Sequence, residues 1–385
     1  MNSSTDLRLF WNRRTVLVWT LLFVAGAAQA CVARSNTNCA LGDAACQPFE
    51  FLVLQELRDE SPEYVAAGYY NQQCALFRSN GLTEWEVRAS IGGCQIMTDV
   101  VRVGDLYVAG GQGSSSNCFL LVSEDHGLSW TSLTCPAGSG SIYDIEYING
   151  EFVAMGSANT GSSTATVLTS PDGYNWTHHA TFPANTTVND FEYNAGFYIV
   201  AALTGIYRSA DIKSSFTGPL DANSYLDVEV NASGVLMAVT DGGTPGIVST
   251  DNGASWSQAS TTLLSNASSA NTVSTRAVSI GDTFVVGGGG FPNGSECMLD
   301  SSTDAGASWS GGYIPHAGCV ASGTNGNLFY EMDRVGDFYF LRHYSVEGGS
   351  LLVQTFLGQA VNPVDGWVFY DLPDELLPVA LAVRD

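Results

Sequence analysis

Seven short hydrophobic runs recur along the chain, each ending in small or apolar residues before a polar, turn-rich stretch. They are Tyr64–Gly68, Leu106–Gly110, Phe152–Gly156, Phe197–Ala201, Val235–Val239, Phe284–Gly287 and Phe338–Leu341. Most are preceded by a segment in which acidic and apolar residues alternate, as in Asp144–Tyr147 and Asp190–Tyr193. Alternation with period two and turn residues at regular intervals are typical of short β-strands. The pattern therefore predicts an all-β chain built from seven similar units.

A polar turn of fixed spacing follows four of the hydrophobic runs. It reads Ser-x-Asp-x-Gly-x-x-Trp, once in a shortened form, with members Ser123, Asp125, Gly127, Trp130; Ser170, Asp172, Trp176; Ser249, Asp251, Gly253, Trp256; and Ser302, Asp304, Gly306, Trp309. Weaker copies start at Ser79, with Trp85, and at Ser209, with Phe216 in the tryptophan place. Consecutive serines lie 44, 47, 39, 40 and 53 residues apart, a length that suits four short strands.

The residue types in this turn suit a tight hairpin between a third and a fourth strand. The aspartate can accept backbone N–H groups, glycine permits a positive φ, and the aromatic ring packs over the hairpin. These segments closely resemble the Asp-box, or bacterial neuraminidase repeat. The resemblance implies a seven-bladed β-propeller of four-stranded antiparallel blades over residues 48–385, with a structural and not a catalytic role for these aspartates.

Two parts of the predicted ring are less regular. The seventh unit has no recognisable turn of this kind, and residues 350–356 and 366–372 are predicted to form its outer strands. The innermost strand of the first unit can be supplied by residues 376–383 or by residues 49–57. Both segments are apolar and of strand length, and the sequence leaves the choice open.

The N-terminus has the features of an export signal over residues 1–30. Arg8, Arg13 and Arg14 precede the apolar run 15–25, which is too short to span a bilayer comfortably, and small residues precede Cys31. Ala28-Gln-Ala-Cys31 resembles a bacterial lipoprotein box, although Ala28 stands where leucine is usual. The resemblance implies lipidation of Cys31, residues 31–47 as a tether, and a location at the outer membrane, periplasm or cell surface. Ordinary cleavage after Ala30, giving a secreted protein, is the alternative.

The nine cysteines favour an oxidising compartment, because eight remain for pairing once Cys31 is set aside. Cys74, Cys118 and Cys297 each lie five residues before a turn serine, and Cys94, Cys135 and Cys319 follow them by 17 to 22 residues. The first cysteine of each pair is predicted on a third strand and the second at or just past the end of the fourth. This placement predicts the bridges Cys74–Cys94, Cys118–Cys135 and Cys297–Cys319, and leaves Cys39–Cys46 by elimination.

The charge of the chain is strongly one-sided. The formal net charge is −24, it becomes −26 once residues 1–30 are removed, and Lys213 is the single lysine. Such a surface repels nucleic-acid phosphates and anionic lipids, so we expect no nucleic-acid partner, membrane contact only through a lipid anchor, and a monomer. Solubility is the simplest reason for the acidity.

Carboxylates recur at matching places on the predicted innermost strands. They are Asp99, Asp144, Glu146, Asp190, Glu192, Asp227, Glu229, Glu331 and Asp333. Near the axis of a propeller they could bind Ca²⁺ or a cationic partner. Alternatively, the recurring aspartate is a structural element that is hydrogen-bonded to a neighbouring unit. No compact calcium-binding or other metal motif is present, so we expect no cofactor, with Ca²⁺ bound by these carboxylates as the alternative.

The resemblance to Asp-box proteins raises the question of sialidase or other glycosidase activity. Sialidases are six-bladed and use three arginines on the substrate carboxylate, whereas only Arg102, Arg276 and Arg334 are inward candidates here. Paired carboxylates of other glycosidases are not diagnostic in so acidic a chain. The chain also resembles non-enzymatic seven-bladed Asp-box propellers, including photosystem II assembly factor-like proteins. We therefore expect an exported module that binds a protein or glycan at one mouth of the propeller, with a glycosidase as the alternative.

Overall fold

The computed structural model divides the chain into two compact units, Met1–Glu60 and Ser61–Asp385, and all of the described residues lie in the second. The structure describes residues 64–70, 73–82, 84–158, 164–183, 186–240, 246–260, 272–290, 298–310, 312–313, 326–335, 338–347, 350–360, 362–363, 367–372 and 376–383. The predictions for the signal peptide, the tether, Cys31 and the bridges Cys39–Cys46 and Cys297–Cys319 lie outside the described residues.

The described residues form seven four-stranded antiparallel sheets. From the innermost strand outward, the first three sheets are β28 (Leu376–Val383), β1 (Tyr64–Tyr70), β2 (Gln73–Ser79), β3 (Glu86–Ser90); β4 (Cys94–Val103), β5 (Leu106–Gly113), β6 (Cys118–Ser123), β7 (Thr131–Ser132); and β8 (Ser139–Ile148), β9 (Glu151–Ala158), β10 (Val167–Ser170), β11 (Thr177–His178).

The other four sheets repeat this order. They are β12 (Val188–Asn194), β13 (Phe197–Ala202), β14 (Gly205–Asp211), β15 (Ser215–Thr217); β16 (Tyr225–Val230), β17 (Leu236–Thr240), β18 (Ile247–Ser249), β19 (Ser257–Gln258); β20 (Thr272–Ile280), β21 (Thr283–Gly290), β22 (Met298–Ser302), β23 (Gly312–Tyr313); and β24 (Gly326–Val335), β25 (Phe338–Glu347), β26 (Ser350–Ala360), β27 (Val368–Asp371). A 3₁₀ turn, η1 (Ser114–Ser116), lies between β5 and β6. Within the described ranges, no helix is long and apolar enough to cross a membrane.

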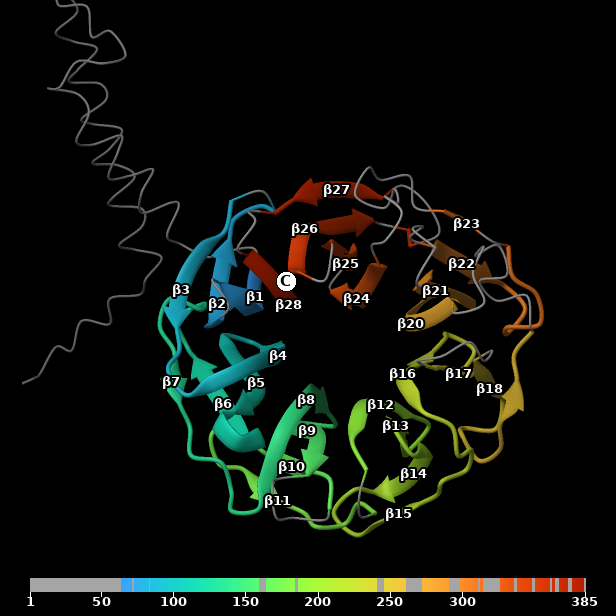
Figure 1. The fold of residues 1–385 in the computed structure, drawn as a ribbon. Coiled ribbons are helices and arrows are strands. Elements are labelled where there is room, and N and C mark those ends of the chain that lie inside the picture. Colours follow the sequence, from blue (N-terminus) through green and yellow to red (C-terminus); the bar gives the residue numbers. More distant parts are fainter. Residues whose placement is uncertain are drawn as a thin grey trace, which may run out of the picture. The chain divides into compact units, whose positions relative to one another are not determined.

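The sheets stand side by side in a closed ring, the arrangement of a β-propeller (Figure 1). Each innermost strand contacts the innermost strand of the next sheet, and β28 contacts both β24 and β4, which closes the circle. β28 pairs with β1 along its whole length, from Tyr64 opposite Val383 to Tyr70 opposite Leu376. The C-terminal segment therefore supplies the innermost strand of the first sheet, which resolves the choice that the sequence left open.

Hydrophobic side chains fill the spaces between neighbouring sheets. Alternate residues of one strand serve two different clusters: Val65 and Ala67 of β1 pack with residues of β4 and β5, whereas Tyr64 and Ala66 pack toward Phe340 of β25. Because both faces of each sheet are covered, the second strands are nearly continuous hydrophobic runs. This two-sided burial explains the seven runs seen in the sequence.

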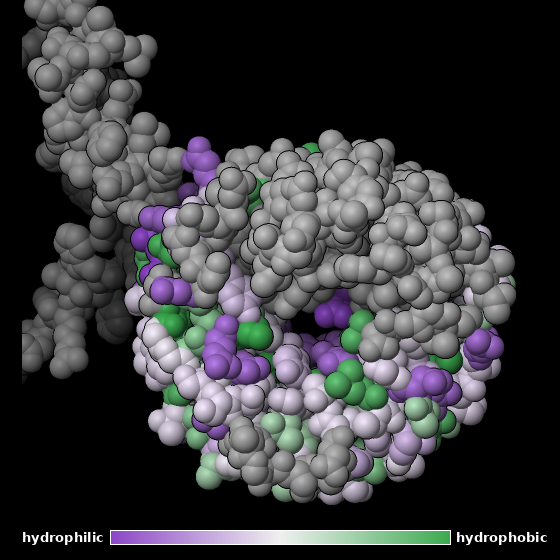
Figure 2. Space-filling model, in the orientation of Figure 1, coloured by the Kyte–Doolittle hydropathy of each residue, from purple (hydrophilic) through white to green (hydrophobic). Residues whose placement is uncertain are grey.

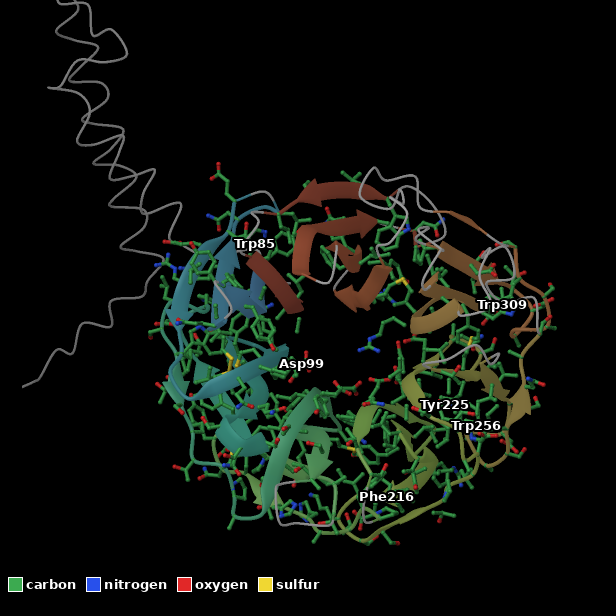
Figure 3. The ribbon with its side chains drawn as sticks, in the orientation of Figure 1. Trp85, Asp99, Phe216, Tyr225, Trp256 and Trp309 are labelled. Atoms are coloured by element: carbon green, nitrogen blue, oxygen red, sulfur yellow. A yellow bond between two sulfur atoms is a disulfide. The ribbon has the colours of Figure 1, made fainter. Side chains whose placement is uncertain are left out.

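The serine-aspartate-glycine segments form the turns between third and fourth strands. In the turn after β18, the Gly253 N–H donates to the Ser249 hydroxyl over 2.9 Å, and the Ser255 N–H donates to the Asp251 carboxylate over 2.8 Å. Gly253 has a φ of +75°, and the Trp256 indole N–H donates to its carbonyl. The tryptophan then packs on the cluster shared with the preceding sheet. Figure 3 shows Trp85, Trp256, Trp309 and Phe216 far from the centre of the ring, at corresponding places in their sheets.

Two disulfides join the predicted partners, Cys74 with Cys94 and Cys118 with Cys135. Cys135 follows β7, as expected. Cys94, however, is the first residue of β4, so its bridge joins the third strand of one sheet to the innermost strand of the next. Cys94 lies just past the end of the fourth strand, as predicted, but it already belongs to the next sheet, because β3 ends at Ser90 and only three residues separate it from β4.

Candidate ligand-binding cavity

Every innermost strand of the seven described sheets carries an extra residue that has no partner on the second strand. The extra residues are Thr98, Tyr143, Asn189, Leu226, Thr275, Tyr330 and Val379. The residues that follow them are Asp99, Asp144, Asp190, Asp227, Arg276, Glu331 and Ala380. A β-bulge bends the strand and redirects the adjacent side chains. The repeated bulge thus gives seven equivalent positions near the centre of the ring, four of them aspartates.

The four aspartates connect successive sheets. Each accepts a hydrogen bond from a backbone N–H of the next innermost strand: Asp99 from Ile145 at 2.8 Å, Asp144 from Phe191 at 3.2 Å, Asp190 from Val228 at 2.7 Å and Asp227 from Ala277 at 2.8 Å. In every case the donor directly follows the residue equivalent to the aspartate. The sequence offered a structural role for the recurring aspartate, a hydrogen bond to a neighbouring unit. One oxygen of each of these four carboxyl groups forms such a bond.

The series of aspartates has a beginning and an end. Ala380 stands at the equivalent place on β28 and offers no acceptor, and the Val100 N–H on β4 is instead bonded by its own neighbour Asp99 over 2.7 Å. Arg276 stands at the equivalent place on β20 and cannot accept a bond. The aspartates on β4, β8, β12 and β16 therefore each bond the next innermost strand, and the last of these bonds is to β20.

A cavity of about 290 Å³ lies where these innermost strands meet. Seven of the described residues that line it carry carboxyl groups: Asp99, Asp144, Glu146, Asp190, Glu192, Asp227 and Glu229. Figure 2 shows an opening at the centre of the ring with hydrophilic side chains inside it, and Figure 3 shows Asp99 close to the centre. The cavity is thus a polar, predominantly acidic space on the inner strands.

Hydrogen bonds between side chains also join Asp190 to Asp144 on one side and to Asp227 on the other. Two carboxyl groups can share a hydrogen bond only when one of them holds a proton. Burial, followed by the charge of Asp190, raises the pKa of Asp144 and of Asp227 well above the ordinary range. Asp144 and Asp227 therefore keep their protons to a higher pH than exposed aspartates do.

Glutamates two residues further along the strands form a second row. Glu146 on β8 and Glu192 on β12 line the cavity, and among the described residues no hydrogen bond or ion pair to either carboxylate is formed. Burial and the neighbouring carboxylates raise the pKa of both. Glu229 on β16 is bonded by Ser279, yet burial still raises its pKa to about 8.

Two of the three arginines predicted to face inward line this cavity. Arg276 donates to the Leu226 carbonyl at 3.4 Å, and its charge opposes the rise in the pKa of Asp227. Arg334 on β24 opposes the rise in the pKa of Glu229 and lies 5.8 Å from the centre of the Tyr339 ring. Arg102 is not among the cavity residues and lies over the Tyr107 ring. No site for one anion held by three arginines is formed by these residues.

The structure brings seven of the nine predicted ring carboxylates together at the cavity, and it places Glu331 and Asp333 on β24, where their side chains lie outside the described residues. In the described part of the chain, no group of three or more His, Cys, Asp or Glu side chains is arranged to hold a metal ion. The sequence reasoning missed Thr98, Tyr143 and Asn189, which also line the cavity. Each directly precedes a recurring aspartate, and aligning the repeats on that aspartate would have revealed them.

Comparisons with known proteins identify the fold but no family. No protein-family model matches the chain, and no curated protein matches it. Among solved structures, YCF48 bound to a D1 peptide has a TM-score of 0.52 and 16% identity, covering 72% of this chain and 85% of that one. A GH74 xyloglucanase from Xanthomonas campestris has a TM-score of 0.53 and 16% identity, over 74% of this chain and 46% of that one.

A third solved structure, a putative 6-phosphogluconolactonase from Bacteroides fragilis, has a TM-score of 0.52 and 11% identity, over 85% of this chain and 99% of that one. YCF48 and the xyloglucanase are β-propellers, which agrees with the ring of sheets described above. Identities this low show a shared fold and nothing about ligands.

Proposed function

We propose that this chain is an exported seven-bladed Asp-box propeller, anchored by a lipid on Cys31, that acts as a monomeric binding module for a protein or glycan. The central cavity is its ligand site. The turn hydrogen bonds and the recurring tryptophans support the assignment of the Asp-box repeat. The N-terminal sequence supports export and anchoring.

The observation that carries the binding proposal is a polar cavity on the inner strands, with two carboxylates at its wall that have no hydrogen-bonding partner among the described residues. Ligand sites are usually concave, largely preformed and equipped with a few convergent polar groups. The hydrogen bonds that connect successive inner strands through Asp99, Asp144, Asp190 and Asp227 hold those groups in place. A pre-organised site reduces the entropy lost when a ligand binds.

The binding proposal is tested by blocking the cavity without choosing a ligand in advance. The full chain is screened on peptide and glycan arrays beside Ala380→Phe, which adds a ring at a position that lines the cavity. Ala222→Phe places the same ring on an exposed loop and serves as the control. We expect the hits to disappear only in the Ala380 variant, with circular dichroism showing that both variants are folded. Hits retained by Ala380→Phe would place the ligand elsewhere.

Export and anchoring are tested separately by mass spectrometry of the mature N-terminus. We expect residues 1–30 to be absent and Cys31 to carry acyl chains. An unmodified Cys31 on a soluble secreted chain would reject the anchor and leave the binding proposal untouched.

A glycosidase is the second candidate, because carboxylates, Arg276 and Tyr143 meet in one cavity. Asp144, Asp190 and Asp227 are poor candidates for the catalytic pair. They are hydrogen-bonded to one another, whereas glycosidase carboxyl groups stand about 5 Å apart or more. Glu146 and Glu192 remain. Turnover of fluorogenic glycosides that is abolished by Glu192→Gln would favour the enzyme over the binding module.

A further inference from the structure

We propose that the central cavity binds a primary ammonium group, such as a lysine side chain of a partner protein, between the glutamate row and the aspartate row. The inference rests on the proposed binding function and names the chemistry of its ligand. It is carried by Glu146 and Glu192, which line the cavity, are only partly exposed, and have no hydrogen-bonding or ion-pairing partner among the described residues.

The charge balance of the cavity favours a cation. Seven carboxyl groups and only two guanidinium groups, those of Arg276 and Arg334, line it in the described part of the chain. Carboxylates that crowd one another in a partly enclosed space repel, and a cationic group with N–H donors both neutralises the charge and satisfies the oxygens. Each aspartate already uses at least one oxygen on a backbone N–H, and Asp99 uses both, so Glu146 and Glu192 are the freest acceptors.

The arrangement of acceptors favours an ammonium group over the other cations. Ca²⁺ needs six to eight oxygens at about 2.3–2.6 Å, and no group of described side chains is arranged to hold a metal. A guanidinium group prefers one carboxylate presented edge-on in its plane, whereas these carboxylates come from successive strands around a ring. An ammonium is compact and has three donors that point in different directions, which suits acceptors on β8, β12 and β16.

Binding of the cation is expected to release protons. Glu229 on β16 faces Asp190 and Glu192 on β12, Glu146 on β8, Ser279 and Arg276 on β20, Arg334 on β24 and Tyr339 on β25. The pKa of Glu229 is about 8, so the empty cavity still holds a proton at neutral pH. A lysine side chain stays charged up to about pH 10. The affinity for it should therefore increase from pH 6 to pH 9, as the carboxyl groups lose their protons.

The test uses Nα-acetyl-lysine methylamide as the probe and the isosteric, uncharged Nα-acetyl-norleucine methylamide as its control, in isothermal titration calorimetry with the full chain. Glu146→Gln/Glu192→Gln removes the two unbonded carboxylates and keeps their shape. Glu86→Gln/Glu124→Gln removes the same charge from exposed positions outside the cavity. We expect the lysine probe to bind the wild type and the exposed control equally, and the cavity variant about 30-fold more weakly.

Three results would overturn the inference: equal binding of the norleucine probe, equal loss in both double variants, or binding of Ca²⁺ without binding of the lysine probe. If the cavity variant does not fold, the wild type decides, because an affinity that fails to rise between pH 6 and pH 9 contradicts the proposal. Array ligands that are lost in Ala380→Phe but contain no lysine would refute the ammonium site while the binding function stands.

Discussion

At the scale of single residues, the turn serine contributes more to the fold than its small size suggests. The Ser249 hydroxyl is buried, accepts the Gly253 N–H and donates to the Asp251 carboxylate over 2.8 Å. The same bonds are formed by Ser123, Ser170 and Ser302. Where the aspartate is missing, Ser79 still accepts the Gly81 N–H. The serine is therefore the constant element of the turn.

We predict that Ser249→Ala lowers the free energy of unfolding by about 1–3 kcal/mol, because the buried Gly253 N–H loses its acceptor. Ser257→Ala, on the exposed side of β19 in the same sheet, should change it by less than about 0.5 kcal/mol. Urea denaturation of the two variants measures the difference. Equal effects would mean that the hydroxyl is replaced by water at no cost.

At the scale of strands and turns, each turn glycine is constrained by the preceding sheet as well as by its own backbone. A Cβ on Gly253 would lie 2.5 Å from the Ile199 Cδ1 atom of β13. Gly150, in the hairpin between β8 and β9, has a φ of +87° but nothing within 4 Å of such an atom. The two glycines therefore separate backbone strain from contact between sheets.

We predict that Gly150→Ala lowers the free energy of unfolding by about 1–2 kcal/mol, the cost of a left-handed backbone for a residue with a Cβ. Gly253→Ala should cost about 1–3 kcal/mol more, because it also displaces Ile199. Denaturant titration of both variants checks the order. Equal costs would mean that Ile199 moves aside freely and that contact between the sheets does not constrain this turn.

The strand pattern could be predicted from the sequence because burial on both faces produces apolar runs that are visible locally. The choice between residues 376–383 and 49–57 could not, because both are apolar and only pairing with β1, hundreds of residues away, selects β28. The acidic row was likewise visible as a repeat. The sequence could not show which of these carboxyl groups are hydrogen-bonded. One oxygen of each aspartate bonds the next sheet, whereas Glu146 and Glu192 have no partner among the described residues. This difference depends on the distance between strands that are some 40 residues apart in the sequence.

At the scale of the whole molecule, the ring concentrates carboxyl groups that would be separated in the unfolded chain. Folding raises the pKa of Asp144, Glu146, Glu192 and Asp227, chiefly through burial, and raises that of Glu229 to about 8. Between the ordinary pKa near 4.5 and pH 8, the folded chain therefore holds more protons than the unfolded chain. Stability must then fall as the pH rises through this window.

We predict that the chain without a bound cation loses stability between pH 6.5 and pH 8, by up to about 1.4 kcal/mol per pH unit for each proton that only the folded state retains. Histidines with lowered pKa, His178 and His179, act in the opposite direction, but only below about pH 6.5. Glu229→Gln should flatten the slope and be more stable than the wild type at pH 8, whereas Glu86→Gln should leave the slope unchanged. Urea denaturation across the pH series measures both slopes. A wild type that gains stability from pH 6.5 to pH 8 would mean that the carboxyl groups around the cavity ionise as freely as those on the surface, and the physical reason for a cation at the centre of the ring would be lost.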